Sequence, residues 1–265
     1  MTIAVGIDAG GTKLAAGRVD TDTGKISDRR VLDTRPSRGG DKVLEDVVGL
    51  ARGLGLGAVA VGIGIPEMVD AAGLIRSAAN WDWRETDFVT PFEDLPRYRI
   101  VSDVHAAALA EARFGAGRER GTFLYVSVGT GISSCLVLGG EPWRGQDGRA
   151  LLLGAPLVEA QSSGPAIARA AGKDAPQQAF ADPACDAVIE AAADALGHEL
   201  ARAVHLADPG LVVLGGGLGL NERYRALVAA ALARHVDTEY VPVPDVVPAG
   251  LGENSGIIGA ALAAL

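Results

Sequence analysis

The chain has little cysteine and no long apolar run. Only Cys135 and Cys185 occur among its 265 residues, so a disulfide framework is not expected and a reducing, cytoplasmic setting fits. No apolar stretch reaches the ~18–20 residues that a membrane span needs. The first apolar run carries Asp8 and Gly10 and has no basic segment before it, unlike a secretory signal peptide. These absences predict a cytoplasmic protein that does not enter a membrane.

The chain also lacks an excess of basic residues. It has 24 Lys plus Arg against 33 Asp plus Glu, a formal net charge of −9. That balance argues against nucleic acid or an anionic membrane as the main partner. It does not argue against ATP, because backbone amides and Mg²⁺ can hold its phosphates locally. The four histidines show no paired metal-ligand spacing. An apolar fraction of 48% allows a sizeable core, in one large domain or two ordinary ones.

Two segments, residues 5–17 and 124–137, are built alike. Each is an apolar run, a Gly/Thr turn and a second small-apolar run, a pattern typical of a β-hairpin. Glycines in such turns let backbone N–H groups approach a bound anion. Two such turns in one chain indicate a duplicated fold that holds nucleotide phosphates between its halves. The candidate phosphate-binding residues are Gly10, Gly11, Thr12 and Lys13 in the first turn and Gly129, Thr130 and Gly131 in the second.

Asp8 ends the first predicted strand, directly before the first turn. A carboxylate there can orient Mg²⁺, directly or through water, beside the β- and γ-phosphates. The spacing is not that of a Walker A loop. A plain Asp-Gly-Gly hairpin turn explains the same residues, and for this segment alone it is the favoured explanation. The second glycine turn shifts the preference to a phosphate site.

Asp103 is the candidate catalytic base. It follows the predicted strand 99–102 and begins a helix. A carboxylate at that edge can accept the proton of an attacking hydroxyl during phosphoryl transfer. Asp is also a preferred helix N-cap, and capping alone explains the residue. The two roles are compatible, because capping would fix the orientation of the carboxylate.

Strands and helices follow one another in both halves of the chain, which indicates an α/β architecture. Strands are predicted over residues 2–8, 14–19, 58–65, 99–102 and 210–214, and helices over residues 41–54, 164–172, 183–207 and 221–235. The helix that starts at Asp103 ends at the Gly-Ala-Gly of residues 115–117, so a domain boundary is expected near residue 115.

A glycine triplet follows the predicted strand 210–214. Its members are Gly215, Gly216 and Gly217. Bare backbone there lets a flat base or a ribose lie against the chain, and it equally suits a strand-to-helix turn with positive φ. The triplet alone does not separate the two explanations.

Two further segments carry candidate acceptor contacts. Asn80 can hydrogen-bond a hydroxyl and Trp81 can pack on a ring face, whereas Trp83 is better explained as a buried anchor of its loop. Glu159 precedes a helix start at Ser163 and is either an acceptor for sugar hydroxyls or a solvated acid.

Taken in order, these motifs resemble the ROK family of sugar kinases, within the actin–hexokinase–Hsp70 ATPase superfamily. The resemblance spans nearly the whole chain. It rests on the first phosphate motif (6–13), the segment with the catalytic aspartate (101–111), the second phosphate motif (129–131), the adenosine motif (208–217) and the C-terminal segment (252–261).

The resemblance implies an α/β, two-lobed, actin-like (ribonuclease H-like) ATPase fold with a central cleft. It implies lobes of residues 1–115 and 116–252, with the C-terminal helix 253–265 packed back on the first. It also implies ATP, Mg²⁺, a homodimer, and phosphorylation of a sugar-like hydroxyl, usually a primary one, with Asp103 as base. The candidate substrate-binding residues are Asn80, Ser102, Asp103 and Glu159, of which Glu159 is the sugar contact that the family's acceptor segment still supplies.

The departures from the family pattern concern the acceptor. ROK hexokinases carry a Gly-Glu-x-Gly-His segment and then a Cys-rich zinc loop. The corresponding residues 145–159 have no cysteine, and Leu152 and Ala155 occupy the Glu and His positions. Ser102 and His105 replace two asparagines that flank the aspartate. Because lost polar contacts weaken binding of plain glucose, a zinc-free kinase of a non-glucose sugar is predicted, with a C7-cyclitol or an aminosugar as examples.

Two other functions compete with the kinase. A non-catalytic sugar sensor of the same family fits the lost acceptor contacts, although ROK repressors carry an N-terminal helix-turn-helix domain and this chain starts at the first phosphate strand. An activator-type ATPase of the same superfamily is the third hypothesis. The presence of Asp8, Asp103 and both glycine turns favours the kinase.

Overall fold

The computed structural model describes residues 2–55, 57–88, 90–95, 97–151, 153 and 156–265. The described strands form two five-stranded sheets. The first sheet, in the order β3-β2-β1-β4-β5, contains β1 (Ile3–Ala9), β2 (Lys13–Asp20), β3 (Ile26–Asp33), β4 (Val61–Ile65) and β5 (Tyr98–Ser102). The second, in the order β10-β9-β6-β7-β8, contains β6 (Thr122–Val128), β7 (Ile132–Leu138), β8 (Glu141–Pro142), β9 (Leu211–Gly215) and β10 (Asp245–Pro248).

The two sheets have the same topology. In the first, β1, β2 and β3 form an antiparallel meander, and β4 and β5 follow on the other side of β1 as parallel strands. In the second, β6, β7 and β8 form the meander, and β9 and β10 are the parallel strands beside β6. The chain therefore folds the same α/β pattern twice, as the two similar hairpins predict.

Helices connect and cover the sheets. They are α1 (Gly40–Gly55), α2 (Asp103–Phe114), α3 (Leu157–Ser162), α4 (Gly164–Ala170), α5 (Pro176–Ala181), α6 (Asp186–Ala207), α7 (Gly216–Gly219), α8 (Glu222–His235) and α9 (Ser255–Ala263). Short 3₁₀ turns lie at Pro36–Arg38, Thr90–Phe92, Pro183–Cys185 and Gly252–Asn254.

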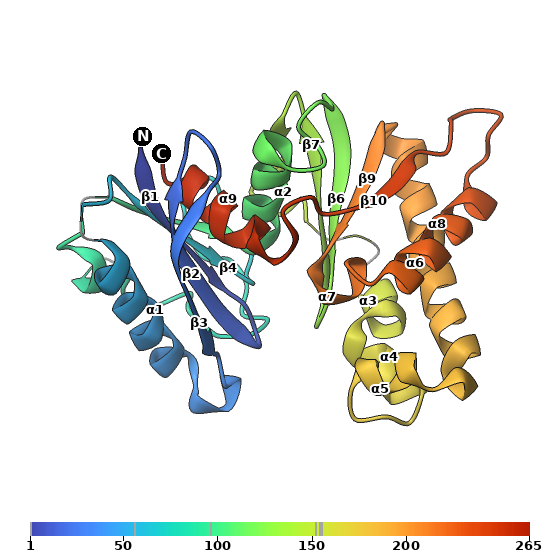
Figure 1. Ribbon diagram of the computed structural model, residues 1–265, viewed down its shortest axis with the longest axis horizontal. Coiled ribbons are helices and arrows are strands. Elements are labelled where there is room, and N and C mark those ends of the chain that lie inside the picture. Colours follow the sequence, from blue (N-terminus) through green and yellow to red (C-terminus); the bar gives the residue numbers. More distant parts are fainter. Residues whose placement is uncertain (1, 56, 89, 96, 152, 154–155) are drawn as a thin grey trace.

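The outer helices bury apolar stripes against the sheets. In α1, Val43, Val47 and Leu54 recur at helical spacing and pack with the first sheet. In the second half, α6 and α8 pack together over the second sheet through residues such as Leu200 and Leu232. These two helices lie on the outer side of that sheet, away from the first (Figure 1).

Helices α2 and α9 lie between the two sheets (Figure 1). Ile257 of α9 belongs to a cluster with Ala4 of β1, while Ala107 of α2 belongs to a cluster with Phe123 of β6. Ala106 of α2 joins Ala260 of α9 in a third. The C-terminal helix thus returns to the first sheet, and α2 contacts the second sheet as well as α9. The lobe boundaries 1–115 and 116–252 stay a prediction.

Several element boundaries differ from the sequence-based expectation. The strand expected over 58–65 begins at Val61, and the helix expected over 183–207 begins with a 3₁₀ turn before α6. Strand β3 was not predicted, because most of its residues are exposed and its sequence does not alternate. Within the described ranges, no helix is both long and apolar enough to cross a membrane.

Candidate active site

Asp8 and Asp103 lie across a glycine at the carboxyl ends of the first sheet's parallel strands. Asp8 of β1 is paired with Gly64 of β4. A Cβ at Gly64 would lie 3.6 Å from the Cα of Asp103. Both aspartates are partly exposed, and the charge of Asp8 contributes to a raised pKa of Asp103. The two candidate residues are therefore brought together at a solvent-accessible edge.

Asp103 is the first residue of α2, directly after the N-cap position of Ser102. The prediction that Asp103 caps the helix is wrong, because the N-cap residue is Ser102 and no side chain caps the start of α2. Asp103 Oδ1 instead accepts a hydrogen bond from the adjacent N–H of Val104, at 2.7 Å. Burial first, and then the charges of Asp8 and Glu67, raise the pKa of Asp103 to about 7. Among the described residues no donor is hydrogen-bonded to Asp103 Oδ2, so this oxygen is available to accept a proton.

Asp8 lies against the first turn of α9. A Cβ at Gly256 would overlap its carboxylate, so only glycine permits this approach. Burial raises the pKa of Asp8 to about 6. Among the described residues the Asp8 carboxylate has neither a hydrogen-bond donor nor an ion-pair partner. An unpaired, partly buried carboxylate suits a divalent cation that keeps most of its ligands as water and phosphate.

Thr34 fixes the first glycine turn through two hydrogen bonds. This fully buried residue donates its hydroxyl to the carbonyl of Gly10 at 2.7 Å and its amide to the carbonyl of Thr12 at 3.0 Å. Thr12 and Lys13 are exposed at the turn. Sequence reasoning missed Thr34, because no motif marks a lone threonine between β3 and α1.

Asn80 lies beside the first turn. A Cβ at Gly11 would lie 3.4 Å from Asn80 Oδ1. The loop that carries Asn80 is fixed by Glu67, whose side chain is only 3% exposed. The Glu67 carboxylate accepts hydrogen bonds from three backbone amides of this loop: Ala79 at 2.8 Å, Asn80 at 2.6 Å and Trp81 at 3.2 Å. It also accepts a hydrogen bond from the Ser77 hydroxyl. Glu67 was also missed; the signal available was an acid two residues after the end of the buried strand β4.

Ser102 is buried beneath this loop. Its hydroxyl donates to the Glu67 carbonyl at 2.8 Å and accepts from the Val69 amide at 3.0 Å. One lone pair is left, so the geometry favours a role in holding the loop against the start of α2.

The second glycine turn brings Glu159 to its edge. Glu159 Oε2 accepts the amide of Ile132 at 2.8 Å, and a Cβ at Gly131 would lie 2.8 Å from that oxygen. The Gly164 amide donates to the carbonyl of Gly129 at 2.8 Å, which ties the turn to the start of α4. Thr130 at its tip is exposed. The acid and the phosphate turn therefore form one local unit.

The glycine triplet adjoins the second turn. Gly216 has φ +73° and lies against the backbone of Val128, so the strand-to-helix explanation holds for this residue. A Cβ at Gly129 would lie 3.9 Å from the amide nitrogen of Gly217. No heavy atom lies within 4 Å of a Cβ placed at Gly217, whereas one at Gly215 would overlap Tyr125. Open backbone thus lies next to the second glycine turn.

Trp81 and Trp83 do not face the cleft. Both are buried, and their rings stack with centroids 4.7 Å apart. Trp83 is the expected buried anchor, and Trp81 shares that position. Leu152 and Ala155 lie outside the described residues. Among the described residues there is no cluster of three or more His, Cys, Asp or Glu side chains arranged to hold a metal ion.

Two similar α/β halves around these glycine turns define the actin-like ATPase fold, and comparisons with known proteins give the family. The ROK family matches residues 4–265, so the chain belongs to it. The ROK glucokinase of Streptomyces griseus, solved with glucose and AMPPNP, superposes with a TM-score of 0.85 at 26% identity over 99% of each chain. The ROK hexokinase of Thermus thermophilus superposes with a TM-score of 0.79 at 32% identity, over 99% of this chain and 98% of that one.

Curated relatives include sugar kinases of more than one specificity. The N-acetylmannosamine kinase of Escherichia fergusonii is 31% identical over 97% of both chains, and the glucokinase of Streptomyces coelicolor is 28% identical over 98% of this chain and 97% of its own. The bifunctional enzyme NanE/NanK of Brucella melitensis is 31% identical over 96% of this chain, which spans 52% of that protein. The chain thus covers about half of this bifunctional relative.

Proposed function

We propose that this protein is an ATP-dependent kinase that phosphorylates a primary hydroxyl of a non-glucose sugar or a sugar-like cyclitol. The observation that carries the proposal is the position of Asp103, a carboxylate with a raised pKa beside Asp8, which directly precedes the first glycine turn. Membership of the ROK family supports it, as do relatives named as glucokinase and N-acetylmannosamine kinase.

The reaction would use Asp103 as a general base. Oδ1 is held by the Val104 amide, so Oδ2 accepts the proton of the acceptor hydroxyl as its oxygen bonds to the γ-phosphorus. The bond between that phosphorus and the ADP oxygen breaks in the same displacement, and ADP leaves. A pKa of about 7 leaves a sufficient fraction of Asp103 ionised at neutral pH. Positioning and charge neutralisation supply most of the acceleration.

The nucleotide would lie between the two halves of the chain, which we take as lobes 1–115 and 116–252. Amides of Gly10 to Lys13 and of Gly129 to Gly131 would bind phosphate oxygens, and the open backbone at Gly217 would receive the adenosine. Mg²⁺, held by Asp8 directly or through water, would neutralise charge on the β- and γ-phosphates.

The acceptor would lie between Asn80 and Glu159. Asn80 flanks the first glycine turn and Glu159 the second, and both would bind hydroxyls of a polyol held next to Asp103. Ser102 would support the loop that carries Asn80. The preference against plain glucose rests on the apolar Leu152 and Ala155 of the sequence, since a site without matching polar partners binds hydroxyls weakly.

An ADP-release screen with Mg-ATP tests the proposal. The panel contains glucose, mannose, N-acetylmannosamine, aminosugars, inositols and C7-cyclitols. We expect turnover on one non-glucose polyol, lowered about 10²–10⁴-fold in Asp103→Asn, because that change removes the base but keeps the side-chain shape. The exposed Asp174, whose carboxylate lies outside the site, gives the matched control Asp174→Asn, which should leave turnover unchanged.

Other outcomes separate the alternatives. Binding of a polyol without any ADP release would favour the non-catalytic sensor. ATP hydrolysis that is indifferent to every polyol and to Asp103→Asn would contradict the mechanism and favour an activator-type ATPase. Turnover restricted to glucose would retain the kinase and reject the proposed acceptor class.

A further inference from the structure

Glu67 is a buried acid that the mechanism above does not use, and its carboxylate is surrounded by donors from a single loop. Its Oε1 accepts the amides of Asn80 at 2.6 Å and Trp81 at 3.2 Å. Its Oε2 accepts the amide of Ala79 at 2.8 Å and the hydroxyl of Ser77. Successive backbone N–H groups that converge form an anion-binding concavity, and here the chain's own carboxylate occupies it. Four donors offset the cost of burying that charge.

The side chain of Asn80 is fixed by the same short segment. Asn80 Nδ2 donates to the carbonyl of Pro66 at 3.1 Å. Asn80 Oδ1 lies toward the first glycine turn, 3.4 Å from a Cβ placed at Gly11. Residues 66–67 therefore hold both the backbone and the side chain of Asn80, while the residue as a whole stays exposed and open to contact with a ligand.

The backbone of Glu67 is tied to the start of α2. Its carbonyl accepts the Ser102 hydroxyl at 2.8 Å, and that hydroxyl in turn accepts the Val69 amide at 3.0 Å. Ser102 is buried and directly precedes Asp103. Glu67 thus holds the segment of the proposed base through its carbonyl and the loop of the proposed acceptor contact through its carboxylate.

Buried aromatic rings anchor the same loop independently of Glu67. Trp81 and Trp83 stack with centroids 4.7 Å apart, and Phe88 meets Trp83 edge-on with centroids 5.6 Å apart. All three rings are buried in the core of the first half. Because these rings stay in place when the Glu67 carboxylate is altered, we expect such a change to displace Asn80 without unfolding the loop.

We propose that Glu67 is a positioning residue for the acceptor: its carboxylate sets the place of Asn80 relative to Asp103, and so determines how a polyol hydroxyl is presented to the base. The proposal rests on the kinase function and on the Asn80 contact proposed above. Glu67 lies buried behind the loop, so it acts through Asn80 and does not touch the acceptor. Orientation of this kind matters, because a misplacement of about 1 Å costs on the order of 10²-fold in rate.

Steady-state kinetics of Glu67→Gln and Glu85→Gln test the proposal. Glutamine keeps the volume of Glu67 but replaces one acceptor oxygen by an NH₂ group, which faces two donors. For the polyol that turns over in the ADP-release screen we expect KM to rise about tenfold or more, while KM for ATP stays within about twofold. Glu85 is an exposed acid in the same connection between β4 and β5, so Glu85→Gln is the matched control and should equal the wild type in both constants.

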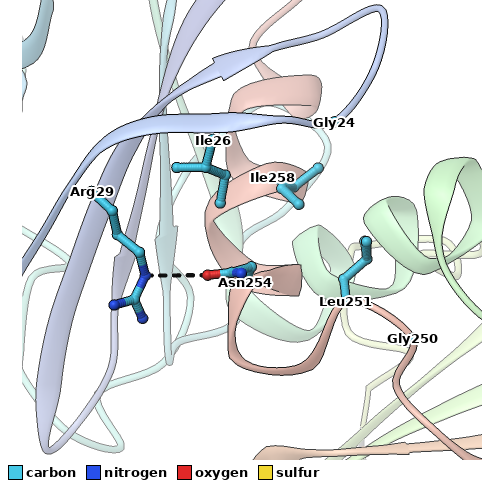
Figure 2. A pocket seen from close by; sticks show the side chains of 7 residues that line it. All are labelled: Gly24, Ile26, Arg29, Gly250, Leu251, Asn254 and Ile258. Carbon is cyan, nitrogen blue, oxygen red and sulfur yellow. Dashed lines mark hydrogen bonds between the residues drawn. The ribbon is translucent and has the colours of Figure 1, made fainter.

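A double-mutant cycle shows whether the effect passes through Asn80. Asn80→Ala should raise the acceptor KM by a similar factor, and adding Glu67→Gln to it should change that KM by less than about twofold. The control is Asn254→Ala. Asn254 lies in a cavity of about 420 Å³ between the β2–β3 hairpin and the segment that leads into α9. Figure 2 shows Arg29 pointing to Asn254, which accepts its hydrogen bond at 3.2 Å. Loss of this hydrogen bond should leave the acceptor KM unchanged.

Two kinetic results would overturn the proposal and leave Glu67 a structural residue. One is an unchanged acceptor KM in a folded Glu67→Gln. The other is full additivity of Glu67→Gln and Asn80→Ala. If Glu67→Gln does not fold, Ser77→Ala takes its place, because it removes one donor and leaves the carboxylate and its three amides. We then expect the acceptor KM to rise about two- to fivefold, and no rise would contradict the positioning role.

Isothermal titration calorimetry with glucose, N-acetylmannosamine and myo-inositol separates the positioning role from the kinase function. A wild type that binds one of these polyols but phosphorylates none would reject the kinase function alone, and weaker binding by Glu67→Gln would then still support the positioning role. A wild type that phosphorylates a polyol which Glu67→Gln uses with the same KM would reject the positioning role alone. A wild type that neither binds nor phosphorylates any polyol would reject both.

Discussion

At the level of single residues, Asp8 and Asp103 are placed where ionisation is unfavourable. Each is drawn from water by the surrounding strands and helices, and Asp103 also faces the negative charge of Asp8. A raised folded-state pKa means that the ionised residue destabilises the fold. Catalytic residues often carry such a cost, because the charge is needed for the reaction.

We predict that Asp103→Asn stabilises the ligand-free protein at pH 8. The folded pKa of about 7 lies above the ordinary value of 3.8 for an aspartate in water, so between these values the native state binds more protons than the unfolded state, and stability falls as pH rises. Above pH 7 the Asp103 carboxylate is ionised in the folded protein as well, and the full free-energy cost of burying its charge lowers the stability. Removing the charge should raise the free energy of unfolding by about 1–3 kcal/mol at pH 8, discounted for the partial exposure of the site.

The measurement is thermal unfolding without nucleotide at pH 4 and pH 8. Asparagine can still accept the Val104 amide through Oδ1, so the local hydrogen bond is retained. We expect a gain in Tm at pH 8 that disappears at pH 4, where the wild-type carboxyl is already protonated. A lower Tm of Asp103→Asn at pH 8 would show that the carboxylate stabilises the fold.

The residues that support the site were the ones that sequence reasoning did not find. Asp103 could be predicted, because its position after a strand and before a helix is a local signal. Thr34 and Glu67 act on backbone groups that are remote along the chain, for example 24 residues away for the bond from Thr34 to the Gly10 carbonyl. No local pattern specifies such partners. Their roles follow only from the tertiary arrangement.

At the level of elements, buried strands and long amphipathic helices were predictable, whereas short or exposed elements were not. Periodicity indicated α1 and α8 because their buried residues recur every three or four positions. Strand β3 is held by pairing with β2 at an exposed edge, and β8 has only two residues. These elements depend on neighbours in the sheet more than on their own sequence.

The small-residue helix α9 is the element on which the first sheet and α2 converge. A Cβ at Gly259 would overlap the carbonyl of Ala106 in α2, and one at Gly62 of β4 would overlap the carbonyl of Ala260 in α9. The helix therefore packs by backbone contact, which explains its run of Gly and Ala.

We predict that Gly259→Ala lowers the free energy of unfolding by about 1–3 kcal/mol, the cost of inserting a methyl group into a closely packed contact. The matched substitution Gly49→Ala lies in α1, where no heavy atom is within 4 Å of an added Cβ. There we expect a gain of about 0.5–1 kcal/mol, because alanine is the better helix former. Urea unfolding midpoints of both variants give the comparison. Equal effects at the two positions would show that α9 is free to move away from α2.

At the level of the whole molecule, the repeated topology gives each sheet a glycine turn at the corresponding position. Each turn joins the first two strands of its own sheet: β1 to β2 and β6 to β7. The duplicated fold could be predicted from the two similar hairpins, and the family match and the superposition on ROK kinases confirm the fold. The way α2 and α9 lie between the sheets could not be predicted from the hairpins alone, since it depends on contacts such as that of Ala106 with Ala260.

A ligand that contacts both halves should stabilise the entire protein in a Mg²⁺-dependent way. With Mg-ATP at 100 times its dissociation constant, we expect a gain of about 2.7 kcal/mol, which corresponds to a rise in Tm of about 5–10 °C for a chain of this length. EDTA should remove most of that rise, because ATP without the cation leaves its phosphates opposed to Asp8 and Asp103. Differential scanning fluorimetry with Mg-ATP, ATP plus EDTA, and Mg²⁺ alone makes the measurement.

The variant Asp8→Asn tests whether the Mg²⁺ effect passes through the proposed residue. It removes the one carboxylate at the first turn that has no protein partner among the described residues, so the difference in Tm between Mg-ATP and ATP plus EDTA should shrink. In the control Asp174→Asn that difference should be unchanged. A rise in Tm that is the same with and without EDTA, in the wild type and in Asp8→Asn, would exclude Asp8 as the point at which the cation joins the nucleotide to the first lobe.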